Sequence, residues 1–185
     1  MKSLRIVQFG KYGMDDDHYT TSEDVQKIFT ENIDSLYLLA LLLTGDQEKA
    51  EQCFVAGVAD SVSATNVFRP WAHAWAKRAI IRNAVRVTHP IPDNGSLSAP
   101  NNFHSDNRWR NFADPHFEAV LALQDFERLV FVISVLERYS DFSCALLLGY
   151  SVQEIRRGRT QAFEQLTGFL RTARFDEESA TQGER

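Results

Sequence analysis

The sequence predicts an all-α protein made of two small helical domains joined by a Pro- and Asn-rich linker. Apolar residues recur every three or four positions through residues 23–87, and again through residues 117–174. Between these stretches, residues 88–116 hold four of the five prolines together with many Asn, Ser and Asp residues, as linkers do. The second domain also contains "LLGYSV" (147–152), a tight corner between two helical patterns that is typical of a helix-turn-helix.

The first domain begins with a helical pattern that Ser22 is placed to cap. The pattern becomes apolar on nearly every side in "LYLLALLL" (36–43), which predicts deep burial of that end. Gly45 suits the position just past a helix, and Asp46 suits the N-cap of a second helix that fades in "DSVSATN" (60–66). Residues 1–22 are expected to form a weakly ordered extension, and its Asp15–His18 run a solvated acidic loop rather than a metal site.

A third long helix is predicted from about residue 68, with Pro70 tolerated in its first turn. One narrow stripe of this helix combines aromatic and basic residues: Trp71, Trp75, Arg78, Arg82 and Arg86. Such a stripe is a candidate DNA contact through its three arginines. The alternative is that both indoles belong to the core and the arginines lie over them in cation–π contacts.

The second domain is expected to contain two helices broken near residues 123–125, then the corner, then a final helix. On that final helix, Arg159 falls among the inward-facing positions and must reach an edge or an internal partner. Inward-facing positions are Val152, Ile155, Ala162, Phe163 and Leu166. Candidate DNA contacts, with Arg156 at the border of the two faces, are Gln153, Arg156, Arg157, Thr160 and Gln161. Alternatively, this helix is a remnant that keeps the fold or a surface that binds protein. Residues 175–185 are expected to be a disordered tail.

Composition limits the classes of function. The formal net charge of −5 and the pI of about 5.5 exclude a global basic field, so nucleic-acid binding requires a local patch. Cys53 and Cys144 lie in apolar helical patterns and are expected to be buried free thiols in a reducing cytosol. No stretch resembles a signal peptide or is long enough to span a bilayer, so a cytoplasmic protein is expected, with no membrane partner.

An enzymatic role is not expected. The five histidines are scattered, with no metal-ligand spacing, no Gly-rich loop after a strand and no nucleophile elbow. We therefore expect no metal, no cofactor and no small-molecule substrate.

Three segments, in order, resemble the extracytoplasmic-function sigma factors of bacterial RNA polymerase. "LYLLALLLTGDQEKAEQ" (36–52) is similar to the first two helices of their core-binding domain, and "FRPWAHAWAKRAIIRNAVR" (68–86) to the next long helix. "LERYSDFSCALLLGYSVQEIRRGRTQAFEQL" (136–166) is similar to the helix-turn-helix that binds the upstream promoter element. The resemblance implies a transcription-initiation factor with RNA polymerase core and promoter DNA as partners, and an anti-sigma-like protein as a regulator.

The chain departs from that family on the second helix and in the loop after it. Where the family has an Asp followed by a Gln-Glu pair that docks on the polymerase, this chain has Gln52, Val55 and Ala56. The loop 59–66 is short and carries no aromatic or basic residue for holding a melted strand. An alternative therefore stays open, a sigma-like protein-interaction module that no longer drives promoter recognition. Its candidate protein-binding residues are Gln52, Phe54, Val55 and Val58.

Overall fold

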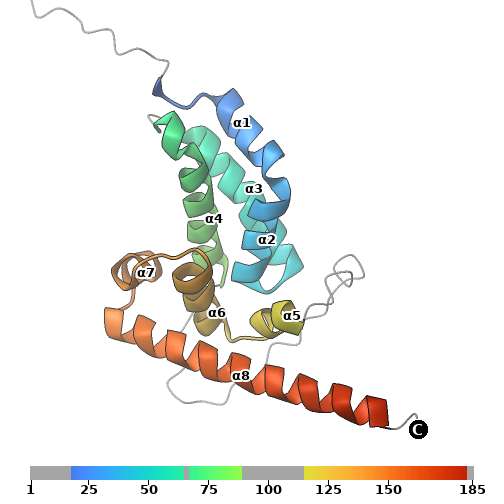
Figure 1. The fold of residues 1–185 in the computed structure, drawn as a ribbon. Helices are drawn as coiled ribbons and strands as arrows, with labels where there is room; N and C mark the ends of the chain where they lie inside the picture. The colour runs from blue at the N-terminus through green and yellow to red at the C-terminus, as the bar shows by residue number, and fades with distance from the viewer. Residues whose placement is uncertain (1–17, 65–66, 89–114, 183–185) are drawn as a thin grey trace, which may run out of the picture.

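The computed structural model describes residues 18–64, 67–88 and 115–182, with side chains as far as 171. The predicted all-α class is confirmed: apart from one isolated bridge between Tyr19 and Phe68, these residues contain no β pairing. The helices are α1 (Ser22–Glu31), α2 (Ile33–Thr44), α3 (Gln47–Ser63), α4 (Ala72–Thr88), α5 (Pro115–Leu121), α6 (Asp125–Phe131), α7 (Asp141–Leu148) and α8 (Val152–Gln182) (Figure 1). A 3-10 turn, Arg69–Trp71, precedes α4, and a π-helical turn, Val132–Leu136, follows α6.

The start of α1 and its end differ from the sequence prediction. The N-cap is Thr21 rather than Ser22, because the Thr21 hydroxyl accepts from the Asp24 amide and the Asp24 carboxylate accepts from the Thr21 amide. At the other end, Asn32 separates α1 from α2. Its side-chain amide donates to the carbonyl of Ile28, 2.9 Å away, and so competes with continuation of the helix.

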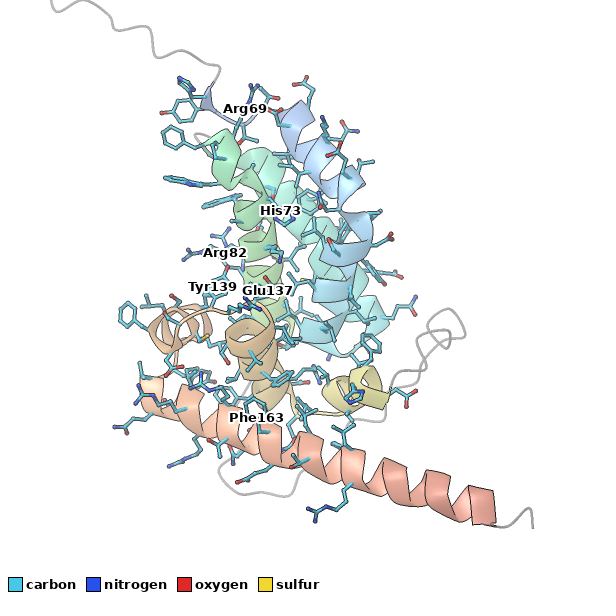
Figure 2. All side chains as sticks on the ribbon, viewed as in Figure 1. Arg69, His73, Arg82, Glu137, Tyr139 and Phe163 are labelled. Atoms are coloured by element: carbon cyan, nitrogen blue, oxygen red, sulfur yellow. The ribbon has the colours of Figure 1, made fainter. Side chains whose placement is uncertain are left out.

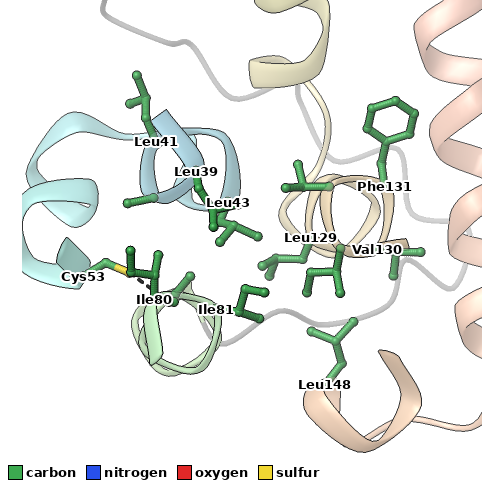
Figure 3. Close-up of a cluster of buried hydrophobic side chains, with 14 of the residues drawn as sticks. Leu39, Leu41, Leu43, Cys53, Ile80, Ile81, Leu129, Val130, Phe131 and Leu148 are labelled. Carbon is green, nitrogen blue, oxygen red and sulfur yellow. Dashed lines mark hydrogen bonds between the residues drawn. The ribbon is translucent and has the colours of Figure 1, made fainter. Parts of the chain in front are cut away.

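The described helices form two packed units, a first helical unit (α1–α4) and a second helical unit (α5–α8), that share one buried core. Leucines of α2 and isoleucines of α4 belong to the same apolar cluster as Leu129 of α6 and Leu148 of α7 (Figure 3). Cys53 lies in this cluster and donates to the carbonyl of Ile80 at 3.1 Å. Both cysteines are buried and free, as predicted. The predicted domain boundaries stay a prediction, and most of the predicted linker, residues 89–114, lies outside the described residues.

Arg128 of α6 joins the two units at the C-terminal end of α2. Its side chain is 1% exposed and donates to the carbonyls of Thr44 and Leu123, both at 2.7 Å. It also pairs with Asp125 at 2.5 Å. Desolvation lowers the pKa of this guanidinium, and the nearby Asp125 opposes that shift. The carbonyl of Thr44, the last residue of α2, has no intrahelical donor and is thus satisfied by the other unit.

The helix α8 runs along the base of the molecule, with α5, α6 and α7 packed against it (Figure 1). It continues to Gln182, whereas the sequence predicts a disordered tail over residues 175–185. The segment contains Glu, Ala and Gln, which favour helix, and its first helix breaker is Gly183. The predicted extension lies outside the described residues up to position 17.

Within the described ranges, the chain has no helix with the length and apolar character needed to cross a membrane. Those ranges also contain no group of three or more His, Cys, Asp or Glu side chains arranged to hold a metal ion.

Candidate nucleic-acid interface

The corner between α7 and α8 is built from local capping interactions. Gly149 ends α7 in the left-handed conformation, with φ 77°, and its amide donates to the carbonyl of Ala145. Ser151 then caps α8: its hydroxyl accepts from the Glu154 amide, and the Glu154 carboxylate accepts from the Ser151 amide at 2.8 Å. These contacts lower the pKa of Glu154 and keep it ionised near the start of the helix. Glu154 therefore has a structural role that explains an acidic residue at this position.

The inward face of α8 packs largely as its sequence pattern predicts. Ile155 and Ala162 are fully buried. Gly158 is also buried, and a Cβ added there would lie 2.6 Å from Cε1 of Phe126. This glycine is therefore required by close packing against α6. Phe163 is the exception, because 46% of it is exposed although its ring packs edge-on against Phe131 at 5.6 Å.

The outward face of α8 is open along its first three turns. Gln153, Arg157 and Thr160 are all exposed, whereas Gln161 is half-buried. Arg157 makes no ion pair with the described residues. Amide and guanidinium groups of this kind can hydrogen-bond to base edges in the major groove. The structure thus brings three of the five candidates on α8 onto one accessible face.

Arg156 and Arg159 are both held by Asp141, the first residue of α7. Arg156 Nε donates to Asp141 Oδ2 at 2.8 Å, and Arg159 Nη1 donates to Asp141 Oδ1 at 2.5 Å. The hydrogen bonds from Arg159 and Arg156 lower the pKa of Asp141 to about 2. Arg159 thus has the internal partner that its inward position required. Arg156 is 66% exposed on its side chain but already paired.

The basic and aromatic stripe of α4 divides into an exposed part and a covered part. Trp71 is 66% exposed, so it is not core, and Arg78 is exposed too. Trp75 is half-buried, and the guanidinium of Arg82 lies 5.5 Å from its ring centroid. The cation–π contact of the alternative is therefore present at Trp75, whereas burial in the core fails for Trp71. Arg86 is exposed near the end of the helix.

Acidic residues of the chain lie close to this stripe. Asp60 of α3 is 4.0 Å from Arg82 and 3.9 Å from Arg86. Lys77, next to the stripe, pairs with Glu137 at 2.8 Å. Figure 2 shows Glu137 and Tyr139, from the connection between the π-helical turn and α7, beside α4 below Arg82. Burial raises the pKa of Tyr139, and Arg78 opposes that shift. The cationic side of α4 is thus partly neutralised from within the molecule.

An exposed aromatic group stands at the N-terminal end of α4. The ring of Phe68 lies 4.9 Å from that of Tyr19 and 5.4 Å from that of Trp71. The backbone amide of Thr20 donates to the carbonyl of Val67 at 2.7 Å and so fixes Tyr19 beside this group. The sequence pattern shows Phe68 and Trp71 three positions apart, but nothing local indicates that Tyr19 joins them.

The candidate protein-binding residues of α3 do not form one surface. Val55 is 67% exposed and Gln52 is exposed, where its amide lies 3.4 Å from Glu48. Phe54 instead points inward and packs edge-on against Phe29 and Tyr37. Val58 is half-buried against the core. A different apolar row is exposed on α3, and its members are Val55, Ala59 and Val62.

Sequence reasoning missed two features of the α7–α8 pair. One is Asp141, whose two partners lie 15 and 18 residues further along the chain, beyond any local pattern. The other is the exposed apolar pair Phe142 and Leu146 on α7, which are 65% and 68% exposed. Their spacing of four residues indicates a shared helix face, but an apolar helix such as "DFSCALLL" does not show which side faces solvent.

No protein-family model and no curated protein matches the chain. Among solved structures, the chain is similar to the sigma factor RpoE of Bartonella quintana, crystallised with the anti-sigma factor NepR. The TM-score is 0.43 at 15% identity, covering 80% of this chain and 98% of that chain. At this TM-score and identity, the likeness establishes neither a shared fold nor a shared function.

Proposed function

We propose that the chain is a divergent, sigma-factor-like regulator of transcription initiation that binds duplex DNA through α8 and acts with RNA polymerase core. The observation that carries this proposal is the accessible, capped N-terminal part of α8, where Gln153, Arg157 and Thr160 share one open face. In helix-turn-helix proteins, the N-terminal residues of the second helix contact base edges. Three segments of the sequence resemble sigma factors in the same order, and this resemblance is the reason for proposing RNA polymerase core as the partner.

The chemistry of the open face suits weak, sequence-preferring binding. Arginine pairs with the O6 and N7 atoms of guanine, and glutamine pairs with the N6 and N7 atoms of adenine. Arg157 supplies the first type of contact, and Gln153 the second. Only one unpaired arginine faces outward in these turns, so few phosphates are neutralised and affinity is expected to be modest.

The stripe on α4 is proposed as a second DNA contact. Arg78 is its exposed cation in the middle of the helix and can contact a backbone phosphate. Arg82 and Arg86 contribute less, because Asp60 already lies near both guanidinium groups. The proposed role is non-enzymatic and needs no cofactor.

The test uses the full chain and a selection for bound sequences from random duplexes, followed by fluorescence anisotropy on the selected duplex. Arg157→Gln is expected to weaken binding about tenfold and to relax the preference at one base position. Arg171→Gln is the matched control, since it removes the same charge from an exposed site on the same helix, far from the corner. No enriched sequence, or equal small effects of both variants, would rule out recognition by this part of α8.

A second candidate function is binding to a regulatory protein, and the exposed row Val55, Ala59 and Val62 favours it. Solvent-exposed apolar residues in such a row suit contact with an apolar helix face. Val55→Asp is expected to abolish co-purification of a stoichiometric protein partner while leaving DNA binding unchanged. Co-purification of polymerase core with the wild-type chain, together with transcription from a selected promoter, would favour the first proposal instead.

A further inference from the structure

We propose that Asp141 is an internal counter-ion that limits the affinity of α8 for DNA, by holding Arg156 and Arg159 in place of phosphate. This inference rests on the proposed function and names a regulator of the same surface. One carboxylate engages both guanidinium groups, with one oxygen at 2.8 Å from Arg156 and the other at 2.5 Å from Arg159. Two of the three arginines in "RRGR" (156–159) are thereby removed from the set of free cations.

Arg156 is accessible enough for a phosphate to compete with Asp141 for it. Its side chain is 66% exposed, so a phosphate oxygen can reach it without any rearrangement of the fold. Arg159 is less accessible, with 29% of its side chain exposed, and is the more structural of the two partners. Arg156 is therefore the cation that DNA would gain if the carboxylate were absent.

The location of Asp141 at the start of α7 further reduces the affinity for DNA. It is the first residue of α7, and the first helix of a helix-turn-helix crosses the DNA backbone. A carboxylate at that helix start repels phosphate and occupies a position where helix N-termini favour anions. Because its hydrogen bonds to arginine lower its pKa to about 2, the group stays charged across the physiological pH range. The limit on affinity is thus permanent and does not act as a pH switch.

A purely structural role for Asp141 predicts different behaviour. If the residue only ties α7 to α8, neutralising it loosens the corner and weakens or leaves unchanged the binding of DNA. If it acts as a counter-ion, neutralising it strengthens binding. The sign of the change in affinity therefore separates the two roles.

The experiment measures binding of the full chain to the selected duplex over a series of salt concentrations. Asp141→Asn is expected to tighten binding about tenfold at low salt and to steepen the slope of log K against log salt by about one, the value for one further phosphate contact. Glu164→Gln is the matched control: it changes the net charge equally on exposed α8 but releases no arginine. It is expected to tighten binding by less than threefold, with an unchanged slope.

A double variant identifies the released cation. Asp141→Asn combined with Arg156→Gln is expected to lose the gain in DNA affinity that Asp141→Asn gives alone. In the wild-type background, Arg156→Gln is expected to reduce DNA affinity less than Arg157→Gln does. That second comparison does not require the Asp141 variant to fold. Asp141→Ser, with a residue that suits helix starts, replaces the Asn variant if thermal unfolding shows that it is destabilised.

The outcomes distinguish this inference from the proposed function. If the wild-type chain binds through Arg157 while Asp141→Asn binds no more tightly, the counter-ion role is overturned and the DNA-binding proposal stands. If neither chain binds any duplex, both are overturned. If Arg156→Gln costs as much as Arg157→Gln in the wild-type background, Arg156 already contacts DNA and the counter-ion role fails.

Discussion

The molecule contains two helix corners with the same local design and opposite surroundings. At each, a glycine in the left-handed conformation ends one helix, with φ 63° at Gly45 and φ 77° at Gly149. At each, a side chain within two residues then caps the next helix: Asp46 accepts from the Lys49 amide, and Ser151 accepts from the Glu154 amide. Local sequence is sufficient to form both corners.

The two corners differ in what packs around the glycine. A Cβ added at Gly45 would lie 2.5 Å from the guanidinium carbon of Arg128, whereas a Cβ at Gly149 would meet nothing within 4 Å. The first corner is thus closed by the second helical unit, and the second is open to solvent. One backbone motif thus serves here both as an anchor between units and as a free surface next to the candidate DNA-binding helix.

The largest expected effect is on the closed corner itself. Arg128→Met removes the donor that satisfies the carbonyl of Thr44 at the end of α2 and that of Leu123 between α5 and α6, and leaves these groups buried. Removing one partner of a buried charged network costs about 3 to 5 kcal/mol of unfolding free energy. Urea denaturation at 25 °C measures this loss of unfolding free energy. Arg157→Met is the exposed control, and its unfolding free energy is expected to lie within about 0.5 kcal/mol of wild type. A loss of unfolding free energy below about 1 kcal/mol for Arg128→Met would show that water readily replaces the hydrogen bonds of Arg128.

Gly45→Ala is expected to have the next largest effect. The left-handed backbone costs alanine about 1 kcal/mol, and the clash with the fixed guanidinium adds about 1 to 3 kcal/mol. In the Arg128→Met background, the clash is relieved, so the two changes should be less than additive in urea denaturation. Strict additivity would contradict the close approach of the two residues.

Gly149→Ala is expected to have the smallest effect of the three. Only the backbone cost of about 1 kcal/mol applies, because there is open space around the position. Gly149→Asn should recover part of that loss, since asparagine tolerates the left-handed region. If Gly149→Ala were as destabilising as Gly45→Ala, the open corner would have to be covered in solution. Urea denaturation of the pair at matched conditions decides this.

Features of the fold that depend on neighbouring residues in the chain were predictable from the sequence. The corner at Gly149 and the break between α5 and α6 lie where the residue pattern places them. The end of α1 at Asn32 was not predicted, because the apolar spacing continues across it and the break depends on one side-chain hydrogen bond. Beyond residue 174, low apolar content predicts disorder, whereas Glu, Ala and Gln favour helix on their own, and α8 extends to Gln182.

The candidate site was predictable where helical geometry alone determines which side chains face solvent. The outward positions of Gln153, Arg157 and Thr160 follow from the spacing of Ile155 and Ala162, which are buried. The pairing of Arg156 with Asp141 could not be predicted, because it depends on how α7 packs against α8. The reason for Gly158, likewise, is an aromatic ring on another helix.

Burial of the two cysteines has a practical consequence for reagent chemistry. Desolvation raises the pKa of the Cys53 thiol to about 12 and that of Cys144 to about 11. Alkylating dyes react with the thiolate, which is scarce at neutral pH for both groups. A single cysteine introduced at an exposed position, such as Thr167 on α8, can therefore be labelled selectively while both native thiols remain in place. Optical probes can then report on this helix in an otherwise unaltered chain.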